Sequence, residues 1–73
     1  MARPDGRTQN IERLEKHLSH TVENLNDAEA YLEEHAEELS PAEVEAIRDK
    51  NERRRANIDQ LQGEIEEERR LEL

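Results

Sequence analysis

The chain has 73 residues, of which 42% are charged and 32% hydrophobic, with one aromatic residue and no cysteine. So short and polar a chain excludes a second domain and a broad globular core, and the missing cysteines exclude a disulfide framework or a zinc–thiolate site. The net charge of -9 argues against binding to nucleic-acid phosphates or anionic membranes, and no run of about 18 apolar residues exists to span a bilayer. What remains is a long-helix protein or a disordered chain.

The first half of the sequence carries a helical pattern. Residues 1–8 contain Pro4, Gly6 and charges with nothing to bury, and are predicted to form a flexible, disordered N-terminal arm. From residue 9 to residue 39 no Gly or Pro interrupts the chain. Its apolar residues follow a heptad repeat, which predicts a helix over residues 9–39 with one apolar seam. The two seam positions are Ile11, Leu18, Leu25, Leu32 and Leu39, and Leu14, Thr21, Ala28 and His35.

Ser40, Pro41 and Glu43 then mark a helix start. Ser40 is a good N-cap, Pro41 suits the first helical position, and Glu43 completes a capping box. These residues predict a turn at 40–41 and a second helix over residues 42–70, followed by a frayed tail at 71–73. The second seam comprises Val44, Ile47, Asn51, Arg54, Ile58, Leu61 and Ile65. A connection this short makes the helices antiparallel, so the predicted fold is all-α: a coiled-coil-like two-helix hairpin of marginal stability.

The charges support the same topology. If the chain reverses near Ser40, facing residue numbers sum to about 81, which brings Asp27 near Arg54 and Glu29 near Arg53. The acidic stretch 27–38 would then lie beside the arginine-rich stretch 48–55. Each exposed pair contributes only a few tenths of a kcal/mol, so the pattern selects register more than it adds stability.

Catalytic and metal-binding candidates are weak. His17 and His20 lie three residues apart without a cysteine or a suitably spaced carboxylate, and are interpreted as surface residues. His35 falls on the seam and is interpreted as a seam residue. The cluster Arg53–Arg55 is the only basic cluster; pairing with neighbouring acids is favoured over a phosphate or RNA contact, because no aromatic residue lies near it for base stacking. We therefore predict no enzyme, no catalytic, cofactor-binding or metal-binding residues, and no cofactor.

Three segments resemble a known family. They are Pro4–Arg7 followed by Asn10–Leu14, the stretch Thr21–Leu32, and the block Ile47–Arg54 continuing to Ile58 and Ile65. Together they resemble the small acid-soluble spore protein Tlp ("thioredoxin-like protein") of endospore-forming bacteria, over roughly residues 4–67. A thioredoxin site needs a Cys-x-x-Cys motif, which this chain lacks. Acid solubility does follow from composition, because protonating all 20 carboxylates leaves 11 Lys and Arg plus 3 His, a charge near +14.

The resemblance implies a protein of the spore core (forespore) whose molecular role is undefined. The N-terminal residues lack the apolar stretch of a secretory signal, which predicts an intracellular location, and with no catalytic candidate we expect a non-enzymatic protein. Two alternatives stay open: a nucleic-acid-associated spore protein, and a hairpin that assembles with a larger protein partner. The half-covered leucines also predict a weak homodimer or an unknown protein partner, with no nucleic acid favoured and no membrane.

Overall fold

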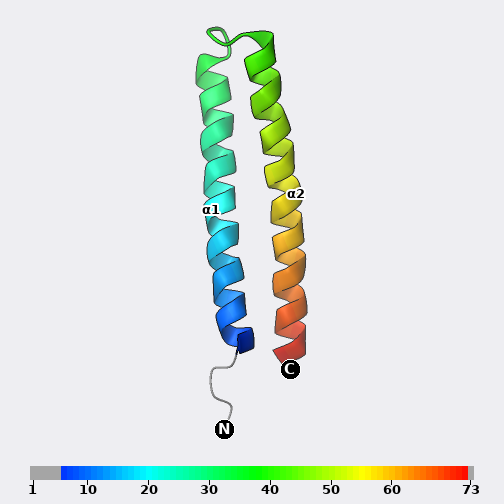
Figure 1. Ribbon diagram of the computed structural model, residues 1–73. Coiled ribbons are helices and arrows are strands. Elements are labelled where there is room, and N and C mark those ends of the chain that lie inside the picture. Colours follow the sequence, from blue (N-terminus) through cyan, green and yellow to red (C-terminus); the bar gives the residue numbers. More distant parts are fainter. Residues whose placement is uncertain (1–5, 73) are drawn as a thin grey trace.

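The computed structural model describes residues 6–72, except the side chains of Arg7 and Glu72. Helix α1 (Gly6–His35) and helix α2 (Pro41–Glu72) run antiparallel and lie side by side along their length (Figure 1). The result is a rod of 58 × 15 × 13 Å with a radius of gyration of 16.7 Å, against about 11 Å for a globular domain of this length. The predicted all-α antiparallel hairpin is confirmed.

The helix ends differ from the predicted ones. Residues 1–5 of the predicted arm lie outside the described residues, whereas Gly6–Thr8 already belong to α1, because each residue added to an existing helix gains a hydrogen bond. Helix α2 covers Pro41–Glu72 rather than 42–70, so most of the predicted tail is helical, and Leu73 lies outside the described residues.

Helix α1 ends at His35, not at Leu39. The carbonyl oxygen of His35 accepts the backbone N–H groups of Glu38 at 2.9 Å and Leu39 at 3.2 Å, which closes the last turn. Continuing the helix would place the negative charges of 37 and 38 at the negative end of its dipole. Residues 36–40 instead form the connection, and Leu39 folds back to become half-buried at the end of the seam.

The capping box at the start of α2 has the predicted geometry. The backbone N–H of Ser40 donates to Glu43 Oε1 at 2.9 Å, and the backbone N–H of Glu43 donates to Ser40 Oγ at 3.2 Å. Hydrogen bonding by the Ser40 backbone N–H, and then by its hydroxyl group, lowers the pKa of Glu43. Two otherwise unsatisfied donors thereby gain partners where the chain reverses.

Both predicted seams form the contact between the helices. Every predicted seam residue is buried or half-buried, and the most covered aliphatic side chains are Ile11, Leu61 (4% exposed) and Ile65 (5% exposed). No described side chain has less than 2% of its surface exposed. A core this thin agrees with marginal stability, because two helices cover only one stripe of each other.

Two polar residues are buried within the seam. Asn51 is 3% exposed, and its Oδ1 accepts a hydrogen bond from Arg54 Nη1 at 2.9 Å. Thr21 donates from Oγ1 to the backbone carbonyl of His17 at 2.9 Å. Within the described part of the chain no buried side-chain nitrogen or oxygen lacks a partner, so these residues weaken the seam without leaving an unsatisfied group.

Candidate functional surface

The three histidines take the surface and seam positions predicted for them. His17 and His20 are exposed. His35 is half-buried on the seam, with its ring centroid 4.6 Å from that of Tyr31 at a tilt of 48°. Carboxylate oxygens of Glu34 and Glu38 lie 3.9 Å and 3.5 Å from its ring nitrogens. Among the described residues, no three His, Asp or Glu side chains converge as a metal site would require.

The arginine cluster separates into three environments. Arg55 pairs with Glu29 across the helices, and Arg54 bonds Asn51 within the seam. Arg53 is exposed, and no ion pair joins it to another described residue. The predicted pairing of Glu29 with Arg53 and of Asp27 with Arg54 is therefore wrong, because Arg55 follows a seam position directly whereas Arg53 lies further round the helix.

One side of the seam carries the two interhelical ion pairs that join described side chains, Glu29–Arg55 and Glu15–Arg69. The two pairs are separated by two heptads on each helix, with the exposed Val22 between them on α1. We call this side the paired edge. Including the residues just outside it, it carries eight acidic side chains (Glu12, Glu15, Glu29, Glu33, Glu45, Glu52, Asp59 and Glu66) and three basic ones (Arg48, Arg55 and Arg69).

The opposite side, which we call the mixed-charge face, is less negative, with five acidic and three basic side chains. A groove on this side is lined by Asn10, Leu14, Glu64, Glu67, Glu68 and Leu71, and shares no residue with the groove beside Glu15 and Arg69 on the paired edge. By their heptad positions, the charged residues of the mixed-charge face are Arg13, Asp27, Glu34, Glu43, Lys50, Arg53, Glu64 and Glu67.

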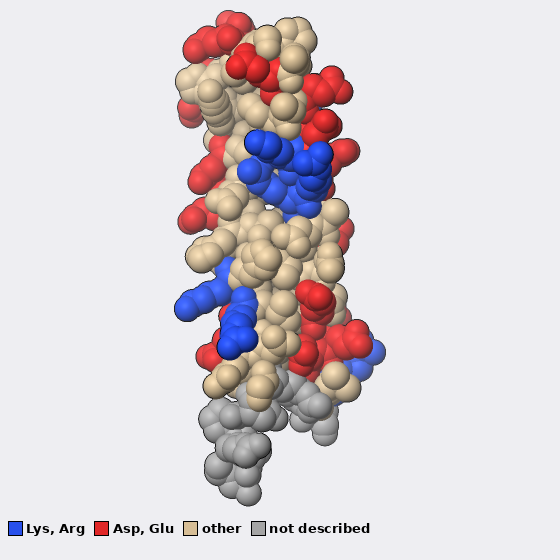
Figure 2. Space-filling model, in the orientation of Figure 1, with Lys and Arg blue, Asp and Glu red and all other residues tan. Residues whose placement is uncertain are grey.

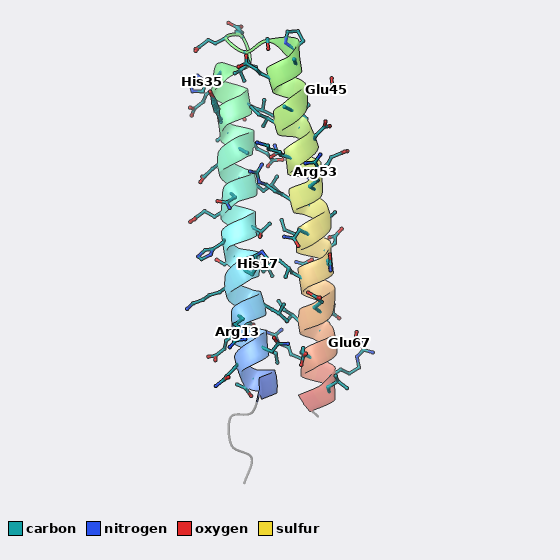
Figure 3. All side chains as sticks on the ribbon, viewed as in Figure 1. Arg13, His17, His35, Glu45, Arg53 and Glu67 are labelled. Atoms are coloured by element: carbon teal, nitrogen blue, oxygen red, sulfur yellow. The ribbon has the colours of Figure 1, made fainter. Side chains whose placement is uncertain are left out.

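The mixed-charge face is the one turned to the reader in the figures. Figure 2 shows Lys and Arg gathered over the upper half of α2, an uncharged band below them, and Asp and Glu lower on the same helix. Lys and Arg also lie low beside α1. Arg13, His17 and Arg53 lie on this side in Figure 3. The uncharged band between the charges consists of His17, His20, Asn24, Asn57 and Gln60.

Three cross-helix contacts define the register. The residue numbers of both ion pairs sum to 84, and those of the hydrogen bond from Asn10 Nδ2 to Glu68 Oε1, at 2.9 Å, sum to 78. Their midpoint is the predicted value of 81, which places Asn24 opposite Asn57. Sequence reasoning obtained this register from the position of the turn, but it did not separate the two sides of the seam. Heptad positions alone could have done so.

Within the described residues, neither α1 nor α2 is long and apolar enough to cross a membrane. The candidate functional features of the described residues are therefore the two shallow sides of the seam, one strongly acidic and one of mixed charge.

Comparison with known proteins identifies the family. Residues 2–72 match the family described as "Small, acid-soluble spore protein Tlp". A small, acid-soluble spore protein Tlp from Oceanobacillus iheyensis is 44% identical over 66 residues, covering 90% of this chain and 89% of the relative. One from Bacillus cereus is 40% identical over 68 residues, covering 93% and 98%, and a Tlp homolog from Desulforamulus reducens is 38% identical over 68 residues, covering 93% of each. No solved structure matches the chain. The chain therefore belongs to the Tlp family of small, acid-soluble spore proteins.

Proposed function

We propose that this protein is a non-enzymatic constituent of the spore core that acts through its surface. The observation that carries the proposal is the shape of the molecule. Two helices share a single thin seam in a rod 58 Å long and 15 Å or less in its other dimensions. Such a rod presents nearly all of its polar side chains to solvent, whereas catalysis relies on a pocket that shifts pKa values and excludes water.

Family membership supports a location in the spore, and the composition suits extraction by acid. At low pH the chain carries many positive charges and few exposed large apolar side chains, which keeps it soluble even when unfolded. An epitope-tagged copy expressed during sporulation should appear in the dilute-acid extract of broken, coat-stripped spores and not in the mother-cell fraction. Recovery from the mother cell or the spore coat would refute a spore-core location.

Nucleic-acid association receives less support. The arginine cluster is divided among an ion pair, a seam hydrogen bond and one exposed residue, and binding to phosphates needs several free basic groups on one surface. We expect no retarded band when micromolar protein is mixed with duplex DNA at physiological salt. A specific shift that weakens as salt rises would favour the nucleic-acid alternative instead.

A further inference from the structure

Four charged residues of the mixed-charge face, two on each helix, follow a two-fold pattern, whereas Glu43, Arg53 and Glu67 lie outside it. On α1, the midpoint between Arg13 and Glu34 falls between Glu23 and Asn24. His20 and Asp27 have the same midpoint. On α2, Lys50 and Glu64 lie seven residues on either side of Asn57. The separation of Lys50 from Glu64 is about 21 Å along the helix, at 1.5 Å per residue.

The two centres lie at the same height of the rod. The cross-helix contacts place Asn24 opposite residues 54–60, with Asn57 at the middle of that range. A copy of the hairpin turned upside down about an axis through these two asparagines would therefore bring opposite charges together on both helices at once. Lys50 would face Glu64 of the copy, and Arg13 would face Glu34 of the copy.

We propose that the mixed-charge face is a homodimer interface, in which two hairpins stack face to face with their turns at opposite ends. The contact is isologous, so each charge pair occurs twice. The uncharged band of His17, His20, Asn24, Asn57 and Gln60 lies at the centre of the interface, and the charged pairs lie toward its ends. This proposal concerns the free protein and is independent of its cellular location.

Long-range electrostatics select this face and this orientation. Two chains of charge -9 repel each other, and the mixed-charge face is the less negative of the two sides of the seam. The paired edge would bring eight acids per copy together. Residues 33–45 contain six acids and no Lys or Arg, so stacking with the turns at the same end would juxtapose twelve carboxylates. With the turns at opposite ends, the two acidic regions lie at opposite ends of the dimer. Their separation is several times the Debye length, which is about 8 Å at physiological salt.

A charge-reversal experiment on the full chain tests the interface. Sedimentation from micromolar to millimolar protein at physiological salt should show a reversible monomer–dimer equilibrium for the wild type. Lys50→Glu should weaken dimerisation by about tenfold, because the two-fold axis repeats each lost contact. Adding Glu64→Lys to that variant should restore the affinity.

Lys16→Glu is the matched control, because it makes the same charge change on the outer surface of α1, away from the seam. It should weaken dimerisation by less than about threefold, through net charge alone. Circular dichroism on each variant checks that the hairpin stays folded. A monomeric wild type, equal effects of Lys50→Glu and Lys16→Glu, or failure of the double variant to recover would each overturn the proposal.

The absence of natural cysteine allows an independent measurement. A spin label on Asn57→Cys, close to the proposed axis, should report a short distance between chains in the dimer. A label on Gln62→Cys, on the paired edge, should report a much longer one. The reverse order would place the interface on the paired edge and refute the assignment.

Discussion

Replacing the buried Asn51 by Ile should stabilise the hairpin. Asn51 occupies a seam position with 3% of its surface exposed, and its Oδ1 accepts one hydrogen bond from Arg54. Burying an isoleucine contributes about 1.5–3 kcal/mol relative to exposing it, and removing a buried amide relieves a desolvation penalty of about 1–3 kcal/mol. Against these stands the lost hydrogen bond to a charged group, worth about 1.5–3 kcal/mol, although the half-buried Arg54 can turn to water instead.

The balance predicts a gain of about 1–2 kcal/mol in the free energy of unfolding, and each kcal/mol raises Tm by roughly 4–8 °C in a domain this small. Thermal and urea unfolding followed by circular dichroism would measure it, at one low protein concentration so that association does not contribute. Asn26→Ile is the matched control, because Asn26 is exposed, and it should change stability by less than about 0.5 kcal/mol. An Asn51→Ile variant that unfolds more easily than the wild type would show that the Asn51–Arg54 hydrogen bond stabilises the seam, contrary to this reasoning.

Three further predictions concern the surface and the cap. Gly63→Ala should raise the free energy of unfolding by about 1 kcal/mol, because Gly63 lies inside α2 and an added methyl group meets nothing within 4 Å; an unchanged Tm would contradict this. The cap lowers the pKa of Glu43 below its ordinary value of 4.5, so Glu43→Ala should lower the free energy of unfolding at neutral pH. The difference in free energy between the variant and the wild type should disappear as pH falls below about 4.5 through the folded-state pKa. A difference that persists in urea melts at low pH would show that the Glu43 charge is not responsible. A double-mutant cycle of Glu29→Gln and Arg55→Gln should give a coupling energy of about 0.2–1 kcal/mol that falls with added salt, and zero coupling at low salt would mean that this exposed pair does not stabilise the hairpin.

The main features of the fold were predictable from sequence, because they rest on local rules. The heptad spacing identifies every residue of both seams, since the side chains that repeat at 3 and 4 residues share one face of a helix whatever it packs against. Ser40 and Glu43 identify the start of α2, because a capping box forms between residues three apart. The antiparallel topology and the mean register then follow from the position and shortness of the turn.

Tertiary structure alone decided the features that depend on contacts between the helices. The end of α1 at His35 is set by the space the chain needs to reverse, together with the unfavourable charges that follow, and no breaker residue in 36–39 marks it. The choice of Arg55 over Arg53 as the partner of Glu29 depends on which side of the seam each long side chain can reach. The sequence by itself therefore determined the two helices, their buried stripes, their register and the residues that lie on each side of the seam. The pairing of surface charges required the packed hairpin, because exposed charges interact too weakly to select their partners before the helices pack.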